Sequence, residues 1–239
     1  MNRTIDVCLS PDLIHLYDFE GKVAVVVDVL RATSCMTTAF AHGIKEIIPV
    51  DSLDVCVDYG NKGFLTAAER NGQKVEGFNF GNSPFSFMSE EIKGKSLCVT
   101  TTNGTRAIEL SKDRADEVIV GSFLNLSAVA AYCQEQDRDV VVVCAGWKGR
   151  VNLEDSLFAG ALVAKLKDNF TVDLDAAKMA LALYDSSKDN MMKALDGCNH
   201  IKRLQKFNIQ KDIDFCLKID QYDVLPKLEG NSLIQQGLK

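Results

Sequence analysis

The sequence predicts an α/β fold, with a layered, largely parallel or mixed sheet flanked by helices and a helical C-terminal extension. A short apolar run followed by a polar turn and a helical pattern occurs at four places, after Leu30, Val99, Phe123 and Ala145. Such alternation is typical of a parallel sheet. Residues 22–30 and 139–145 are nearly continuous β-branched runs, which suit central strands covered on both faces. We therefore expect one α/β domain over residues 1–239, with residues 173–239 packed on it as a mainly helical extension.

The elements follow in order from apolar runs and their breakers. Strands are predicted at 5–9, 22–30, 44–50, 97–99, 117–123 and 139–145. Helices are predicted at 35–41, 52–71 with a break near 61–63, 106–112, 128–136, 152–166, 175–184, 190–204 and 211–217. Gly43 closes the first helix, and the glycines, Asn82 and Pro84 of residues 74–84 indicate a loop. No regular element is predicted after Pro226.

Composition narrows the possible partners. The net charge is −6 and there is no basic tract, so we do not expect binding to nucleic acid or to an anionic membrane. Residues 1–16 lack the apolar core of a secretion signal, and the apolar run at 23–27 is too short to span a bilayer, so a cytoplasmic location is expected. The eight cysteines form no Cys-x-x-Cys pair and are expected to be buried thiols. None of the three histidines stands at metal-ligand spacing from another, which disfavours a histidine-based metal site.

The polar turn at 100–105 joins a strand to a helix and carries four threonines, Asn103 and Gly104. Unpaired amides and the helix dipole favour an anion at such a helix start. Gly104 can adopt a positive φ and let a ligand approach the backbone, and Asn103 or Thr105 can cap the helix. An ordinary capped turn requires the same residue types, so a phosphate or sulfonate cradle and a structural turn are both open.

Asp28 and Arg31 lie at the end of the apolar strand 22–30. A buried acid is costly unless it is paired or binds metal, and an arginine can bind phosphate or sulfonate through two hydrogen bonds. A simple Asp28–Arg31 ion pair is the alternative, and we favour the functional interpretation because buried charges often mark sites. Thr33 and Ser34 stand at the following helix start, where capping is their simplest role.

Two acids and a lysine follow the strand 139–145. Glu154 and Asp155 occupy the first turn of a helix, where they either complement the helix dipole or bind Mg²⁺ through hard oxygen ligands. Lys148 lies in a glycine-flanked loop and either neutralises a second anionic group or is simply exposed to solvent.

These motifs, taken in order, carry a resemblance to a known family. They are residues 27–34, the Gly81-Asn82-Ser83-Pro84 segment, residues 100–105, Gly121-Ser122-Phe123-Leu124-Asn125, and Cys144-Ala145-Gly146 with Glu154-Asp155. The chain resembles the 2-phosphosulfolactate phosphatase family. The resemblance implies Mg²⁺-dependent hydrolysis of (R)-2-phospho-3-sulfolactate to 3-sulfolactate and phosphate, a step of coenzyme M biosynthesis. The family usually has threonine where Ser34 stands, and Gly-Glu-Arg is common where Ala68-Glu69-Arg70 stands.

The implied site combines a metal with several anion-binding groups. Asp28 and Arg31 are the predicted catalytic residues, and Mg²⁺ is expected on Asp28, Glu154 and Asp155. The predicted substrate-binding residues are Thr33, Ser34, Asn82, Ser83, Thr101, Thr102, Asn103, Gly104, Thr105, Arg106, Ser122, Asn125 and Lys148. Residues 101–105 are expected to hold phosphoryl oxygens, and Arg31 with Arg106 or Lys148 to grip the remaining anions.

Two questions stay open at this point. Asp28 can act as a metal ligand or as a nucleophile, although the Asp-x-Asp signature of one aspartyl-phosphate class is absent around it. A non-catalytic binding protein or sensor for a small phosphorylated or sulfonated acid is the alternative function. The expected partner is a small anionic phosphoester, and a homo-oligomer is compatible with the sequence.

Overall fold

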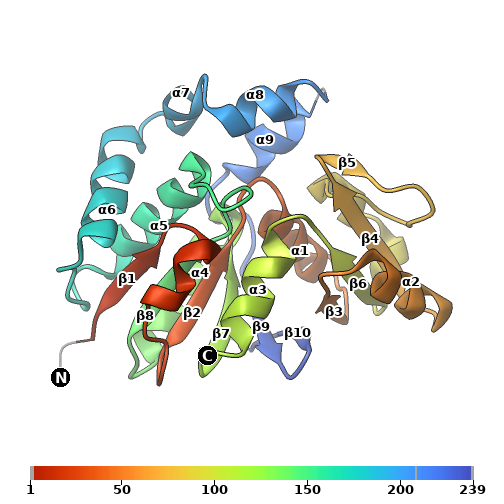
Figure 1. The fold of residues 1–239 in the computed structure, drawn as a ribbon, viewed down its shortest axis with the longest axis horizontal. Helices are drawn as coiled ribbons and strands as arrows, with labels where there is room; N and C mark the ends of the chain where they lie inside the picture. The colour runs from red at the N-terminus through yellow and green to blue at the C-terminus, as the bar shows by residue number, and fades with distance from the viewer. Residues whose placement is uncertain (1–2, 208, 238–239) are drawn as a thin grey trace.

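The computed structural model describes residues 3–207 and 209–237. Within these residues one mixed sheet of ten strands is flanked by helices, including those of the C-terminal region, which confirms the predicted fold class (Figure 1). The strand order is β1-β8-β2-β7-β9-β10-β3-β6-β4-β5. The strands are β1 Ile5–Cys8, β2 Val23–Val27, β3 Glu46–Pro49, β4 Leu65–Arg70, β5 Gln73–Lys74, β6 Ser96–Thr100, β7 Glu117–Gly121, β8 Val140–Cys144, β9 Pro226–Glu229 and β10 Ser232–Gln235.

The described helices comprise nine α-helices and four short 3-10 helices. The α-helices are α1 Ala32–Ala41, α2 Leu53–Asn61, α3 Gly104–Lys112, α4 Leu126–Glu135, α5 Leu153–Leu166, α6 Asp175–Ser187, α7 Met191–Leu195, α8 Asn199–Gln205 and α9 Gln210–Cys216. The 3-10 helices are η1 Pro11–Leu16, η2 Pro84–Phe87, η3 Glu90–Ile92 and η4 Phe123–Asn125.

The sheet consists of two parallel groups joined by an antiparallel hairpin. Strands β1, β8, β2 and β7 pair in parallel, as do β3, β6 and β4. The hairpin β9–β10 lies between the groups and pairs antiparallel with β7 and β3. The expectation that no regular element follows Pro226 is therefore wrong. Leu233 of this hairpin is fully buried, so burial in the sheet stabilises a segment whose own sequence is a weak strand signal.

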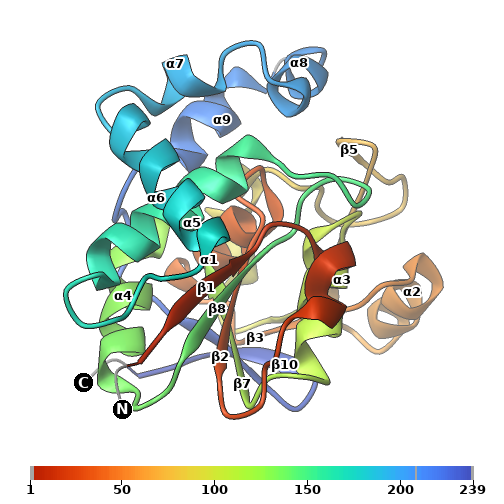
Figure 2. The same ribbon diagram turned by 60° about the vertical axis from the view of Figure 1, so that its left-hand side comes forward.

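The two faces of the sheet are covered by different helices. Along β2, Val23, Val25 and Val27 pack into a core shared with α4, α5 and α6. Ala24 and Val26 pack on the other side, with α1, α3 and η1. Figure 2 shows α5 and α6 on one side of β1, β8 and β2, with α3 on the other. Side chains alternate along a strand, so the all-apolar run of β2 is the expected sequence for a strand covered twice.

Two other predicted elements are wrong in kind or extent. Residues 65–70 were expected to be helical, but they form β4, which is held between β6 and β5. The helix predicted over 190–204 is split into α7 and α8 at Gly197, which has a φ of 72°. This break lets α8 lie across from the β4–β5 turn (Figure 1).

No helix among the described residues combines the length and apolar character needed to cross a membrane. The cysteines are free thiols, and all but Cys198 are buried.

Candidate active site

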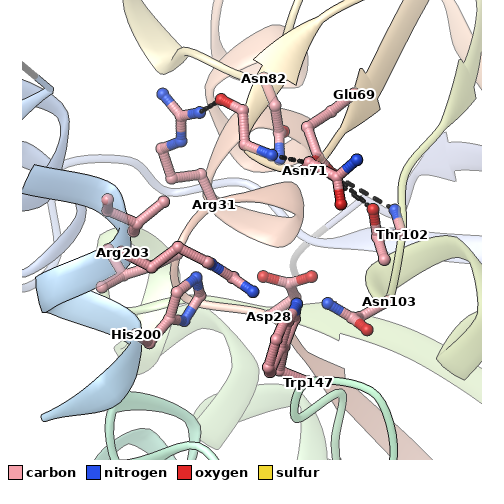
Figure 3. A pocket seen from close by; sticks show the side chains of 13 residues that line it. Asp28, Arg31, Glu69, Asn71, Asn82, Thr102, Asn103, Trp147, His200 and Arg203 are labelled. Atoms are coloured by element: carbon pink, nitrogen blue, oxygen red, sulfur yellow. Dashed lines mark hydrogen bonds between the residues drawn. The ribbon is translucent and has the colours of Figure 1, made fainter. Parts of the chain in front are cut away.

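A narrow pocket lies where the loops after β2, β6 and β8 meet the β4–β5 turn and α8 (Figure 3). From the predicted set, its wall contains Asp28, Arg31, Asn82, Thr102 and Asn103. The loops converge because α3, which follows β6, packs on β2.

Asp28 follows β2 directly and is fixed by its own backbone. The Thr33 hydroxyl donates to the Asp28 carbonyl at 2.9 Å, and the Asp28 amide donates to that hydroxyl at 3.0 Å. The side chain is only 7% exposed, and its Oδ1 accepts a long hydrogen bond of 3.4 Å from the Ala32 amide. Burial raises the Asp28 pKa to about 6, although His200 nearby acts to lower it. The pocket therefore contains a poorly compensated carboxyl group.

Gly104 begins α3 and lies against Asp28. A Cβ atom on Gly104 would stand 2.5 Å from the Ala32 Cβ and 2.9 Å from Asp28 Oδ2. Gly104 does not adopt a positive φ, so our expectation about its backbone is wrong. The glycine is required here by space, since it allows the start of a helix to approach a carboxylate closely.

The β6–α3 turn is braced by two threonines. The Thr105 amide donates to Thr101 Oγ1 at 3.1 Å, and the Thr101 amide donates to Thr105 Oγ1 at 3.2 Å. The Asn103 and Gly104 amides make no hydrogen bond to any residue that the structure describes. These two donors at the helix start are thus left for solvent or a ligand.

Glu154 and Asp155, at the start of α5, are buried, with 0% and 1% exposure. Asp155 accepts the Val29 amide at 2.9 Å and the Gly146 amide at 3.0 Å, so it ties the loops after β2 and β8 together. Burial, with the nearby charges of Glu154 and Asp28, raises its pKa well above the usual value. One oxygen of Glu154 contacts His200 Nδ1, while Oε2 has no hydrogen-bond partner in the described part of the chain.

These contacts decide which acids have oxygens free for a metal. The described residues contain no group of three or more His, Cys, Asp or Glu arranged to hold one. Mg²⁺ needs fewer, because it often binds one or two carboxylates and keeps several waters. Asp28 and Glu154 offer such oxygens, and their charges influence each other. Both oxygens of Asp155 are occupied by backbone amides, so the donor set fits Mg²⁺ on Asp28 and Glu154 better than on all three acids.

The three cations that were predicted to bind substrate have different partners. Arg31 forms a buried ion pair with Asp212 of α9, not with Asp28, and donates to the Gly72 carbonyl at 3.1 Å. Figure 3 shows its guanidinium directed away from Asp28. Arg106 lies outside the pocket wall and pairs with Asp12 at 2.6 Å. Lys148 is exposed, with its Nζ 5.0 Å from the centre of the neighbouring Trp147 ring.

The remaining predicted residues are held by structural hydrogen bonds. Ser34 donates to the Val29 carbonyl at 2.8 Å, and Ser83 donates to an Asp212 oxygen at 3.0 Å. Ser122 and Asn125 are fully buried and form a capping box at η4. The structure thus brings the β2, β6 and 81–84 segments together at the pocket, whereas Ser122 and Asn125 lie apart from its wall.

Five further polar or aromatic residues line the pocket that sequence reasoning did not assign to the site, namely Glu69, Asn71, Trp147, His200 and Arg203. Glu69 accepts hydrogen bonds from the Gly72 amide and, at 3.2 Å, from the Thr102 hydroxyl, so it joins the β4–β5 turn to the β6–α3 turn. Trp147 is the one tryptophan of the sequence and stands in a glycine-flanked loop, which was an available signal. His200 and Arg203 come from α8, and no local pattern links that helix to Asp28.

The fold and pocket together define a class: an α/β protein with a small polar pocket at strand ends, where a buried carboxylate meets a helix N-terminus. Comparison with known proteins gives the particular family. A family model for 2-phosphosulpholactate phosphatase matches residues 8–231. The chain therefore belongs to the 2-phosphosulfolactate phosphatase family, which confirms the resemblance.

Individual relatives are similar in sequence to nearly the whole of this chain. A probable 2-phosphosulfolactate phosphatase of Caldanaerobacter subterraneus subsp. tengcongensis is 42% identical over 219 residues, covering 89% of this chain and 90% of that protein. One of Thermotoga maritima is 42% identical over 231 residues, covering 96% and 97%. One of Clostridium perfringens is 34% identical over 244 residues, covering 98% of each. Proteins so named are phosphoric monoester hydrolases, so the expectation of that enzyme class is confirmed for the family.

Proposed function

We propose that this chain is a Mg²⁺-dependent phosphatase that hydrolyses (R)-2-phospho-3-sulfolactate to 3-sulfolactate and phosphate. The observation that carries the proposal is the contact between the buried Asp28 carboxylate and the start of α3, within a small pocket of a family member. We further propose that the reaction serves coenzyme M biosynthesis in the cytoplasm.

The substrate carries a phosphate, a sulfonate and a carboxylate, or about four negative charges when the phosphate is doubly ionised. Mg²⁺ held by Asp28 and Glu154 would offset part of this charge and polarise the phosphoryl group. His200 keeps one oxygen of Glu154 occupied and so directs the other. Glu154 would therefore offer Mg²⁺ a single carboxylate oxygen, Oε2.

The turn at α3 supplies the neutral donors. The free amides of Asn103 and Gly104 are suited to hold phosphoryl oxygens, because donors at a helix start favour an anion. Preorganised donors aimed at developing charge stabilise a transition state without reorganisation. The Thr101–Thr105 hydrogen bonds hold this turn in one conformation. Hydrolysis breaks the bond from phosphorus to the ester oxygen, which leaves as the alcohol after gaining a proton, while the water oxygen ends on phosphate.

A phosphate-release assay on the purified protein tests the proposal. We expect release from (R)-2-phospho-3-sulfolactate with Mg²⁺, loss of release with excess chelator, and recovery when Mg²⁺ is restored. A panel of other small phosphoesters defines selectivity. Absence of turnover, together with tight substrate binding that ignores the chelator, would contradict the proposal and favour the alternative of a non-catalytic binding protein or sensor.

A further inference from the structure

We propose that Arg203 on α8 binds the acid group that the substrate carries besides its phosphate, so that the C-terminal helices set specificity. The proposal rests on the proposed function for the identity of the ligand. Arg203 would thus be the cation of the pocket wall that binds the sulfonate or the carboxylate of the substrate.

The cations near the pocket differ in whether they already have a partner. Arg31 is neutralised by Asp212, and Arg106 by Asp12 outside the pocket wall. Lys148 points its ammonium group to the Trp147 ring and is not part of the wall. Within residues 3–207 and 209–237, Arg203 is the arginine of the wall that forms neither an ion pair nor a side-chain hydrogen bond.

The Arg203 guanidinium lies over an aromatic ring. Its central carbon lies 4.2 Å from the centre of the Trp147 ring. Stacking on an aromatic face leaves the in-plane N–H donors of an arginine available. Figure 3 shows the Arg203 side chain reaching from α8 into the pocket, with its guanidinium near Asp28. Trp147 therefore acts as a platform that holds the fork in place.

The Arg203 side chain is partly withdrawn from solvent. Arg203 Nε is buried and has no acceptor among the described residues. Burial lowers the Arg203 pKa, and the nearby charges of Glu69, Glu154 and Asp28 only partly offset this effect. A desolvated donor without an acceptor is costly, and an anion that accepts two charge-assisted hydrogen bonds removes the cost. A planar fork matches the oxygen pairs of carboxylates and sulfonates.

Binding of 3-sulfolactate, measured by calorimetry, tests the inference without requiring turnover. This compound keeps the sulfonate and carboxylate but has no phosphate. We compare the parent with Arg203→Gln and Arg203→Lys, using Lys202→Gln as the control because Lys202 is exposed on the same helix. Inorganic phosphate is the second ligand, and isethionate and lactate show which acid group Arg203 prefers.

We expect Arg203→Gln to weaken 3-sulfolactate binding by about tenfold to a hundredfold, the effect of losing hydrogen bonds to a charged group. The affinity of Arg203→Lys for 3-sulfolactate should lie between those of the parent and Arg203→Gln, because lysine keeps the positive charge but lacks the planar guanidinium. Phosphate affinity of both variants, and all affinities of Lys202→Gln, should stay within about twofold of the parent. Thermal melts confirm that the variants are folded.

Two results overturn the inference: no binding of 3-sulfolactate to the parent, or an equal loss for 3-sulfolactate and phosphate in folded Arg203→Gln. Failure of the proposed function gives a different result. In that case the parent protein binds 3-sulfolactate through Arg203 but releases no phosphate from (R)-2-phospho-3-sulfolactate.

Discussion

Replacing Gly104 with alanine tests whether the close approach of α3 to Asp28 matters for activity. The added Cβ would lie 2.5 Å from the Ala32 Cβ, whereas carbon atoms in contact prefer about 3.5–4.0 Å, so one of the two elements must move by about 1 Å. The same atom would lie 2.9 Å from Asp28 Oδ2, so the carboxylate is displaced as well.

The magnitude follows from two opposing effects. Overpacking a well-packed region costs about 1–3 kcal/mol. Alanine in a helix regains about 0.5–1 kcal/mol relative to glycine, and this gain applies because Gly104 does not need a positive φ. We expect a net loss of about 1–2 kcal/mol, or roughly 2–8 °C in Tm for a domain of this size. A shift of about 1 Å in a reacting group can reduce the rate about a hundredfold.

The assay compares Tm and the rate of phosphate release for the parent, Gly104→Ala and Gly60→Ala. Gly60 lies in α2, and its added Cβ would meet one methyl group of Thr66 at 3.1 Å, far less severe than the contacts of Gly104. We expect Gly60→Ala to retain activity. If Gly104→Ala melts and turns over like the parent, the tight contact with Asp28 has no functional role and this reasoning is refuted.

Two further predictions concern buried acids. Asp155→Ala leaves the Val29 and Gly146 amides without acceptors. At about 1–3 kcal/mol for each amide, the free energy of unfolding measured in urea should fall by about 2–6 kcal/mol. A fall below about 1 kcal/mol would show that water replaces the carboxylate. Asp212→Ala leaves Arg31 buried without its partner and should cost about 3–5 kcal/mol, whereas Asp214→Ala on the exposed side of the same helix should be nearly neutral. Equal effects of the two α9 variants would contradict the importance of the Arg31–Asp212 pair.

The sequence predicted those parts of the fold in which local pattern and final environment agree. The valine run of β2 is apolar at every position because both faces of the strand are covered, and the 100–105 turn has the residue types that a helix start requires. Residues 65–70 contain alanine, glutamate and arginine, which favour helix, but pairing with β6 overrides this preference. The C-terminal hairpin has an available turn signal at Gly230-Asn231, yet its place between β7 and β3 depends on the whole sheet.

The residues of the candidate site also differ in whether the local sequence identifies them. Asp28 was found because an acid at the end of an apolar strand is unusual in itself. His200 and Arg203 look like ordinary helix residues, and their place in the pocket follows from the break at Gly197 and from the packing of the C-terminal helices. Arg31 was predicted to bind an anion of the substrate, but it pairs with Asp212, which is 181 residues away in the chain. Long-range pairs of this kind leave no local pattern.

The most direct test of the account is the activity and stability of Asp28→Asn. This change removes a carboxylate proposed to hold Mg²⁺ while keeping the size of the side chain. It also replaces a buried charge that accepts one long hydrogen bond with a neutral amide, so the fold should be as stable as the parent or more so. We expect Mg²⁺-dependent phosphate release to fall by orders of magnitude with an unchanged or raised Tm. Parent-like turnover with parent-like Mg²⁺ dependence in Asp28→Asn would contradict the assignment of this pocket as the catalytic site.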